Sequence, residues 1–426
     1  MNKKVSVFNI GCKVNQYECD CIQGALEKTG VETSNELIYA DIYVVNTCSV
    51  TAEAERKSRQ IISRIRKINP KADIIITGCA AQKNPQFYED KGASIITGVL
   101  NKNQLIENTK NIIQGSIELI NKRIEPINTK NDIAYENISS YAILNKTRAF
   151  VKIQDGCDNF CSYCTIPLLR GNARSRNILS IVSEMEELKY LTKEVVLTGI
   201  NLSSYGKDIN ESLVTLIEKM KDMPFRFRIG SFYLEGIDED LMVALVKSNN
   251  FCPHFHLSLQ SCSDSVLFDM GRRYNSKNIE EKVRLIKSFF PVSSITADII
   301  VGYPTESEKN YSETYDNIKS LGLSSIHVFP FSRRENTKSY YLKPLSNDII
   351  KERKHNIIEL SKILEKDFLK KMLFEKQNVI FERKEKSGLF SGYSEYYIKV
   401  YSDSKQEMAS ITPTGLFQDG LIGVEE

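Results

Sequence analysis

QDGCDNFCSYC, residues 154–164, decides the fold because it places three cysteines on one short loop, Cys157, Cys161 and Cys164, with Tyr163 before the third. Three thiolates at this C-x3-C-x2-C spacing are typical of a [4Fe–4S] cluster, which keeps one iron open for a further ligand. A structural zinc ion would need a fourth ligand, and the nearest histidine along the chain is His254. A disulfide fits poorly because the number is odd and the loop is short, so free buried cysteines are the alternative.

Length and composition predict a multidomain protein without a membrane span. The 426 residues correspond to about two to four domains, and 41% of them are hydrophobic. The net charge of +3 is too small to indicate a nucleic-acid partner by itself. No apolar run of about 18 residues and no signal peptide is present, so ten cysteines favour reduced thiols and metal ligation. We expect a cytoplasmic protein.

The first hundred residues show a βαβαβ pattern. Strands are expected at 4–10, 41–47, 73–77 and 93–97, with helices at about 15–29 and 51–68. This alternation predicts an N-terminal α/β domain with a parallel sheet over residues 1–100.

Three cysteines of this domain each follow a predicted strand: Cys12, Cys48 and Cys79. Because the carboxyl ends of parallel strands face one crevice, spacings of 36 and 31 residues need not separate them in space. They predict a second three-cysteine site for a [4Fe–4S] cluster, and three buried core cysteines are the alternative. Cys19 and Cys21 lie within the first helix and are interpreted as structural.

Residues 148–372 alternate six strands with helices. The strands are expected at 149–154, 194–198, 226–231, 255–259, 295–301 and 325–329, and the helices at about 177–190, 211–221, 238–247, 264–270, 277–288 and 308–320. A further helix over 347–372 closes the domain. Six units rather than eight predict a partial (β/α)6 barrel. The chemistry of such barrels lies at the carboxyl ends of the strands, and the cysteine loop follows the first strand.

The cysteine loop resembles the S-adenosylmethionine (SAM) site of the radical-SAM superfamily, C-x3-C-x-aromatic-C. The resemblance implies that the open iron binds SAM and that the reduced cluster cleaves it to a 5′-deoxyadenosyl radical. Successive strands of the first domain are followed by Gly-Cys, Asn-Thr-Cys and Thr-Gly-Cys. This arrangement, ahead of such a domain, resembles the methylthiotransferases. This resemblance implies two [4Fe–4S] clusters, SAM as cofactor, and an electron donor such as flavodoxin or ferredoxin.

The residues around the first cysteine, GCKVNQYE (11–18), resemble the MtaB branch of this family. That branch transfers a methylthio group to C2 of N6-threonylcarbamoyladenosine at position 37 of tRNA, so the anticodon stem-loop is the implied partner. The branches for isopentenyladenosine and for a ribosomal-protein aspartate carry different residues there and stay alternatives. An iron–sulfur electron carrier or a tRNA-binding regulator is the alternative from another class.

Residues at the strand ends are candidate contacts for SAM or the substrate. We expect Tyr163, Asn201, Ser231, Gln260, Asp298, Arg170 and Arg174 among them. Arginines suit the carboxylate of SAM or a tRNA phosphate, and a structural role is the alternative for each. Cys262 stands where the family usually has glycine, which leaves the local contact open. His254 and His256 are expected to pack or to form hydrogen bonds.

Three other segments are interpreted mainly from composition. Helix 51–68 carries six basic residues opposite a predicted buried stripe of Ile61, Ile65 and Ile68, and its basic face is either solvated or contacts tRNA phosphate. Residues 101–147 are expected to be an irregular or partly helical connection. Residues 373–426 resemble a TRAM domain, a small β-barrel that usually binds tRNA, although the segment 372–426 has six Lys and Arg against nine Asp and Glu.

Overall fold

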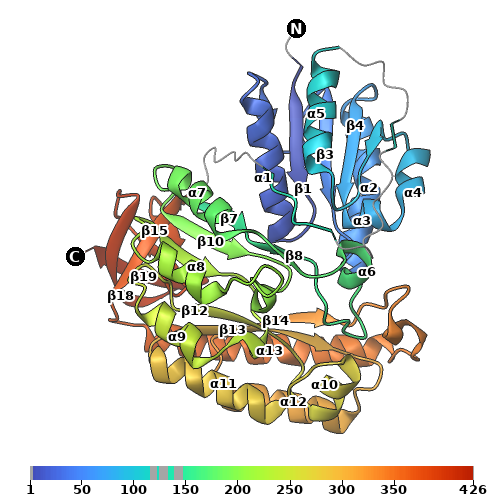
Figure 1. The fold of residues 1–426 in the computed structure, drawn as a ribbon. Helices are drawn as coiled ribbons and strands as arrows, with labels where there is room; N and C mark the ends of the chain where they lie inside the picture. The colour runs from blue at the N-terminus through green and yellow to red at the C-terminus, as the bar shows by residue number, and fades with distance from the viewer. Residues whose placement is uncertain (1–2, 116–121, 124–132, 139–146, 426) are drawn as a thin grey trace.

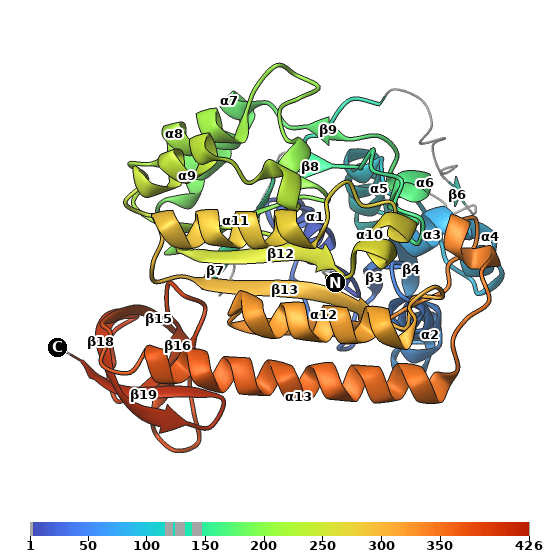
Figure 2. The ribbon, with the colours of Figure 1, turned by 90° about the horizontal axis from the view of Figure 1, so that it is seen from below.

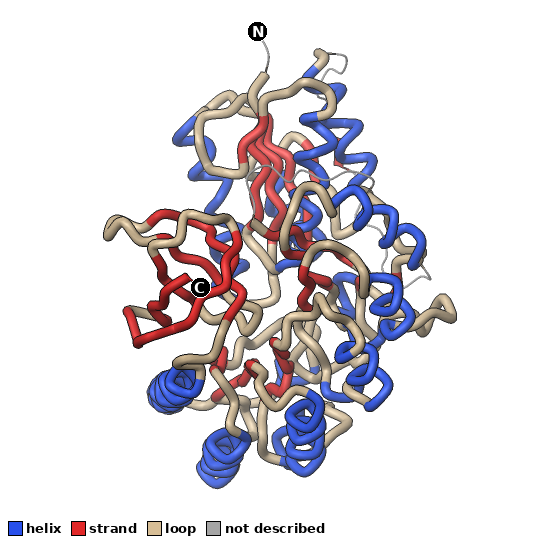
Figure 3. Tube along the Cα trace, turned by 90° about the vertical axis from the view of Figure 1, so that its left-hand side faces the viewer, coloured by secondary structure: helices blue, strands red, loops and turns tan. Residues whose placement is uncertain are grey.

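The structure is a computed structural model that describes residues 3–115, 122–123, 133–138 and 147–425. Three units follow one another along the chain: an α/β sheet domain, a strand-and-helix barrel, and a small β-barrel at the C-terminus (Figure 1). Figure 3 shows the strands of these units as separate groups. The mixed α/β fold predicted from the sequence is confirmed. No helix of the described ranges is both long and apolar enough to span a membrane.

The N-terminal domain is a parallel sheet in the order β2-β1-β3-β4-β5-β6. Its strands are β1 (Val5–Asn9), β2 (Thr33–Ser34), β3 (Ile42–Thr47), β4 (Asp73–Gly78), β5 (Ile95–Ile96) and β6 (Lys122–Arg123). Its helices are α1 (Lys13–Glu27), α2 (Ala52–Ile68), α3 (Cys79–Lys83), α4 (Pro85–Asp90) and α5 (Lys102–Ile113). Helices α1 and α5 cover one face, and α2 and α4 cover the other. The strand expected over 93–97 shortens to two residues.

Helix α5 lies in the segment expected to be irregular or partly helical. Leu105, Ile106 and Ile112 of this helix pack in the same apolar cluster as Ile22 and Leu26 of α1. The many asparagines and lysines of this segment obscure its apolar spacing in the sequence. Its helix therefore belongs to the core of the N-terminal domain.

Helix α2 begins where its sequence predicts. The side chain of Thr51 accepts a hydrogen bond from the Ala54 amide and caps the first turn. The buried stripe consists of Ile61, Ile62 and Ile65. Ile68 is only partly buried, so the predicted i, i+4, i+7 stripe is wrong at its last position. The helix ends at this residue, two positions before Pro70, because the residue preceding a proline disfavours helical backbone.

The central domain is a partial barrel of two three-stranded parallel sheets, ordered β11-β10-β7 and β12-β13-β14. The strands are β7 (Arg148–Lys152), β10 (Glu194–Thr198), β11 (Arg226–Ile229), β12 (His254–Gln260), β13 (Ser294–Val301) and β14 (Ser325–Pro330). Isolated bridges at Phe227–Phe251 and Phe232–Leu257 join the two sheets. Six parallel strands therefore curve around one lumen, as the sequence predicts.

Helices cover the outside of this barrel (Figure 2). They are α7 (Ile178–Leu188), α8 (Leu213–Met220), α9 (Glu239–Val246), α10 (Asp264–Met270), α11 (Ser276–Phe289) and α12 (Glu308–Leu321), and the long α13 (Asn347–Lys371) packs against β14 and α12. Short elements complete the domain: α6 (Ile166–Arg170), the antiparallel pair β8 (Gln154–Asp155) and β9 (Arg174–Ser175), and three 3-10 turns at 202–204, 234–236 and 338–341.

Alternation along the strands makes the lumen polar. Val195 and Leu197 of β10 lie in the apolar core beneath the helices, whereas Glu194 and Thr198 alternate with them and point the other way. Arg226 and Arg228 alternate in the same way with Phe227 of β11. The helices thus cover apolar side chains, and charged side chains fill the space between the two sheets.

The C-terminal unit is a closed barrel in the order β15-β16-β17-β19-β18. Its strands are β15 (Gln377–Lys384), β16 (Phe390–Tyr393), β17 (Lys399–Ser402), β18 (Met408–Phe417) and β19 (Gly420–Glu425). It docks at the amino-terminal end of the central strands, where Arg226 donates to the carbonyls of Asn378 and Tyr393 at 2.6 and 2.8 Å. Arg228 donates to the carbonyls of Glu395 and Ser394 at 2.7 and 2.5 Å. The small barrel therefore closes that end of the lumen.

The glycine before Cys79, Gly78, lies where the edge of the sheet is tightly packed. Gly78 has φ +95°, and an added Cβ would lie 2.4 Å from the Thr47 carbonyl oxygen. Gly78→Ala should lower the free energy of unfolding by about 3 kcal/mol or more, since it adds a backbone collision to an unfavourable φ. Gly30→Ala is the matched control, because Gly30 has φ +80° with open space around it; it should cost only about 1 kcal/mol. Equal losses in urea unfolding would contradict the packing argument.

Candidate functional site

The three cysteines of the N-terminal domain converge at one edge of its sheet. Cys12 follows β1 and caps α1, Cys48 follows β3, and Cys79 follows β4 as the first residue of α3. The thiols of Cys12 and Cys79 both act electrostatically on Cys48, so the set is close in space despite its spacing along the chain. Two of the three, Cys12 and Cys79, stand at the start of a helix, and burial raises the pKa of the Cys79 thiol.

The cysteine loop of the central domain is held from several directions. Gly156 has φ +68°, and an added Cβ would lie 1.9 Å from the Asn172 carbonyl, so only glycine fits before Cys157. The Cys157 amide donates to the Gly171 carbonyl at 3.0 Å. Ser162 donates from its amide to the Met270 carbonyl at 3.0 Å. The loop therefore has one backbone path, and its three cysteines lie at the carboxyl end of the barrel.

Both cysteine sets fit an iron–sulfur cluster better than a zinc ion. Among the described residues, neither set has all three sulfurs within 4.8 Å of one another. Four thiolates around one zinc would lie about 3.8 Å apart, at Zn–S bonds of about 2.3 Å. Burial raises the pKa of Cys48 and of Cys164 to about 12, so these thiols lose their protons only when a metal binds.

Unpaired polar atoms beside the cysteine loop fit a polar cofactor there. Asn201 donates from Nδ2 to the Cys157 sulfur at 3.8 Å, and its buried Oδ1 has no hydrogen-bond partner among the described residues. Arg272 lies 4.5 Å over the ring of Tyr233, and its buried Nε and Nη1 also lack partners there. An amide and a guanidinium with free hydrogen-bonding capacity suit the amino and carboxylate groups of SAM. The sequence places Arg272 after the fourth strand of the barrel but does not distinguish it from Arg273 beside it.

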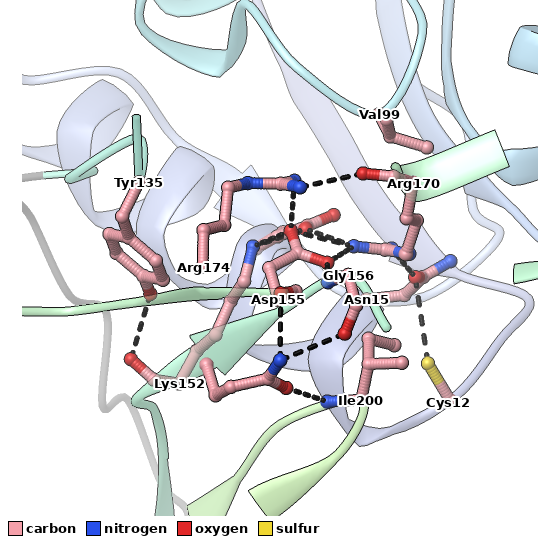
Figure 4. Close-up of polar contacts among 12 residues, drawn as sticks. Cys12, Asn15, Val99, Tyr135, Lys152, Asp155, Gly156, Arg170, Arg174 and Ile200 are labelled. Carbon is pink, nitrogen blue, oxygen red and sulfur yellow. Dashed lines mark hydrogen bonds and ion pairs between the residues drawn. The ribbon is translucent and has the colours of Figure 1, made fainter. Parts of the chain in front are cut away.

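A buried ionic network joins the two cysteine sites. Glu18 of α1 is fully buried and accepts from Lys152 of β7 at 3.0 Å and from Arg170 of α6 at 3.2 Å. Asp155 of the cysteine-loop strand contacts the same two cations at 2.7 and 2.9 Å. Figure 4 shows the Arg170 guanidinium between Asp155 and Asn15, and Cys12 beside Asn15. The first helix of one domain is thus fixed to the cysteine loop of the other.

The cations keep both carboxylates ionised in spite of their burial. Burial raises the pKa of Glu18, but Lys152, Lys102 and Arg170 outweigh it and hold this pKa at about 2. Burial likewise opposes ionisation of Asp155, yet Arg170 and Lys152 hold its pKa well below the usual value. The carboxylates carry their charges at neutral pH, and in spite of burial they raise the pKa of Lys152 and of Arg170 beside the cysteines.

The structure places the two arginines predicted to bind SAM in this network. Arg170 donates from Nη2 to Asn15 at 2.8 Å and interacts with Cys79 of the other domain. Arg174 lies 3.0 Å from Asp155 and donates to the Arg170 carbonyl at 2.6 Å. Both guanidinium groups thus pair with Asp155, and their contact with SAM stays a prediction.

The remaining predicted residues occupy two levels of the barrel. Tyr163 lies beside Cys161, Cys164 and Arg272, so it belongs to the cysteine loop. Gln260 ends β12 with φ +70°, and Ser231 follows β11 half-buried, both at the carboxyl rim. Asp298 lies lower, within the lumen, where it contacts His256 at 3.1 Å. The structure therefore separates Asp298 from the residues of the cysteine loop.

Comparisons with known proteins identify the family. The model of "Uncharacterized protein family UPF0004" matches residues 4–98, and that of the radical SAM superfamily matches residues 151–318. The "Threonylcarbamoyladenosine tRNA methylthiotransferase MtaB" of Aquifex aeolicus is 36% identical over 373 residues, which cover 86% of this chain and 90% of the relative. The chain belongs to the radical-SAM tRNA methylthiotransferase family. The protein of the same name from Bacillus subtilis is 33% identical over 95% of this chain and 91% of its own length.

A further relative and one solved structure are also similar to this chain. A "tRNA-2-methylthio-N(6)-dimethylallyladenosine synthase" of Natranaerobius thermophilus is 33% identical over 79% of this chain and 76% of its own length. The structure of the radical SAM methyltransferase TsrM from Kitasatospora setae, with cobalamin and a [4Fe-4S] cluster bound, matches with a TM-score of 0.58 at 18% identity. It covers 80% of this chain and 77% of that one, and it supports the fold alone.

The iron content should reveal both clusters. Anaerobically reconstituted protein should hold about eight irons per chain, four for each cube. The triple variant Cys157→Ala, Cys161→Ala, Cys164→Ala should keep about half of this iron, because the N-terminal set is intact. A double variant of Cys19 and Cys21 to Ala, two buried cysteines of α1 outside both sets, is the control and should lose none. A triple variant with full iron content would remove the loop from the cluster ligands.

The buried network should dominate the coupling of the two domains. Glu18→Gln leaves Lys102, Lys152 and Arg170 without their shared carboxylate, which should cost about 3–5 kcal/mol of unfolding free energy. Glu53→Gln is the control: its pair with Arg56 at 2.6 Å is solvent-exposed and should contribute less than about 1 kcal/mol. Urea unfolding measures both. Similar losses in the two variants would show that the network is dispensable.

Proposed function

We propose that this protein transfers a methylthio group to C2 of N6-threonylcarbamoyladenosine at position 37 of tRNA. The observation that carries the proposal is the pair of three-cysteine sites joined by the Glu18 network, in a chain 31–36% identical to five relatives named for this reaction. Two [4Fe–4S] clusters and SAM are the cofactors of this chemistry. When bound, they supply a sulfur to be methylated and a radical that removes hydrogen from the base carbon.

The side chains of this chain bind and position the reacting groups. Cys12, Cys48 and Cys79 would hold the cluster on the sheet edge, and Cys157, Cys161 and Cys164 the cluster on the barrel loop. Asn201 and Arg272 offer hydrogen bonds beside the loop. The Glu18 network fixes the two domains to each other, so an unpaired base could be held between them without a domain movement.

The anticodon stem-loop is the partner that fits this arrangement, since an unpaired base is easily splayed out of a loop. The basic face of α2 is a weaker contact than its sequence indicates: Arg56 pairs with Glu53 and Arg66 donates to the Ala72 and Gly92 carbonyls. Arg64 and Lys67 of this face remain exposed. A cytoplasmic location and a flavodoxin or ferredoxin as electron donor belong to the same proposal.

The second candidate substrate is dimethylallyladenosine (isopentenyladenosine). Three relatives named for it are 28–33% identical to this chain, whereas five relatives named for threonylcarbamoyladenosine are 31–36% identical. The residues after Cys12 also resemble the threonylcarbamoyladenosine branch. We therefore place the threonylcarbamoyl substrate first.

Nucleoside mass spectrometry tests the reaction. Reconstituted protein with SAM, dithionite and tRNA bearing N6-threonylcarbamoyladenosine should give the 2-methylthio nucleoside. Cys48→Ala should abolish this product and keep SAM cleavage to 5′-deoxyadenosine, whereas Cys157→Ala should abolish both. A product found only with isopentenyladenosine would select the second substrate, and equal loss of SAM cleavage in both variants would contradict the two-site division of work.

A further inference from the structure

Four polar side chains on neighbouring strands share one face of the sheet formed by β12, β13 and β14. His256 of β12 pairs in register with Thr296 of β13, and Asp298 of β13 pairs with His327 of β14. Thr296 and Asp298 are two residues apart, so both point to the same side of their strand. Ala297 between them packs in the apolar core beneath the helices, which places the four polar side chains on the opposite, lumen side. The hydrogen-bonded strands therefore hold them in fixed relative positions.

Three of these side chains direct metal-binding atoms toward one point. One ligand atom from each of His256, Asp298 and His327 lies within 4.8 Å of the others. Oδ1 of Asp298 is 3.1 Å from Nε2 of His256 and 3.6 Å from Nδ1 of His327. The ligand atoms of a tetrahedral zinc site, with bonds of about 2.0–2.1 Å, lie about 3.3 Å apart. The two spacings from Asp298 are therefore close to those of a coordination sphere.

Hydrogen bonding explains only one of the two contacts to Asp298. The distance of 3.1 Å from His256 is within the range of a hydrogen bond, whereas 3.6 Å from His327 is too long for one. The two imidazole rings nevertheless lie together, with their centroids 4.9 Å apart. Two imidazole nitrogens turned toward one carboxylate oxygen are a common donor set of divalent metal sites. A bound metal ion accounts for the position of both rings.

A hydroxyl group fixes the orientation of the His256 ring. Thr296 Oγ1 donates to the Phe255 carbonyl at 3.5 Å and lies 2.8 Å from Nδ1 of His256, so it accepts from this nitrogen. The lone pair of Nε2 then faces Asp298, and a cation must lie between the two because they otherwise repel each other. Metal-binding histidines are usually oriented by such a contact at the second ring nitrogen. This cation is a proton or a metal ion, and the position of His327 favours the metal ion.

We propose that His256, Asp298 and His327 bind one divalent transition-metal ion, with zinc as the ion that fits best. Two imidazole nitrogens and one carboxylate oxygen suit zinc, whereas magnesium and calcium prefer oxygen ligands. The His327 side chain is 58% exposed, and it lines a cavity of about 260 Å³ that α13 and the C-terminal barrel also border. The fourth coordination position opens toward this cavity, where a water molecule or an anion can occupy it. The site is separate from both cysteine sets and goes beyond the proposed function.

Metal analysis of the reconstituted protein tests the site. Both clusters are assembled first, so that the six cysteines are occupied; zinc sulfate is then added, and the excess is removed by gel filtration. The protein should retain about one zinc ion per chain in addition to its iron, and X-ray absorption at the zinc edge should show nitrogen and oxygen neighbours at about 2.0–2.1 Å without sulfur at about 2.3 Å. This measurement needs no variant, so it stays decisive where a substitution disturbs the fold.

Variants then assign the zinc ion to these side chains. Thr296→Val removes the hydroxyl that orients His256 and should raise the Kd for zinc roughly 10- to 100-fold. His327→Ala and Asp298→Ala each remove a ligand and should raise this Kd further. His355→Ala changes an exposed histidine of α13 outside the site and is the control, which should keep the zinc affinity of the wild type. The iron content of each variant checks that the cysteine sites are intact.

The outcomes distinguish a metal site from a hydrogen-bonded group. Zinc bound through nitrogen and oxygen, weakened in the ligand variants and unchanged in His355→Ala, would support the proposal. No retained zinc, zinc with sulfur neighbours, or wild-type affinity in His327→Ala and Asp298→Ala would overturn it and leave a proton between His256 and Asp298. The assay contains no tRNA and no SAM, so its result is independent of whether the protein methylthiolates tRNA.

Discussion

The ionisation of Glu18 in a fully buried position is the constraint on which this molecule depends. A carboxylate without water is stable only among cations, and Lys102, Lys152 and Arg170 supply them from three different elements. Only the first of these belongs to the same domain as Glu18. The charge can therefore be satisfied only when the sheet domain sits on the barrel, and this requirement fixes the two cysteine sites relative to each other.

The same principle closes the other end of the barrel. Arg226 and Arg228 share Glu194 within the lumen and use their remaining hydrogens to hold backbone carbonyls of the C-terminal barrel. Backbone carbonyls bind these arginines without adding charge, so the acidic composition of the small barrel does not hinder docking. Each neighbouring domain is thus attached by buried charges of the central strands, and the lumen between them stays polar.

Local sequence patterns predicted most of the architecture. Apolar alternation located the six central strands to within about two residues, because each buries one face beneath a helix. The position of Cys12, Cys48 and Cys79 after parallel strands predicted that they meet at one edge of the sheet. The apolar spacing gave wrong or no predictions where packing depends on distant residues. Ile62, and not Ile68, completes the buried stripe of α2. Helix α5 packs into the N-terminal core although its composition does not predict a helix there.

The sequence by itself determined the two cysteine sets, because their chemistry follows from residue type and from position after a strand. Only the tertiary structure decided the partners of the charged residues. Arg170 and Arg174 suit a SAM carboxylate from sequence, yet they lie against Asp155. Glu18 lies at the domain interface and His327 in the lumen, and no local pattern predicted their partners. Ion pairs join residues more than a hundred positions apart, and no local periodicity records such a contact.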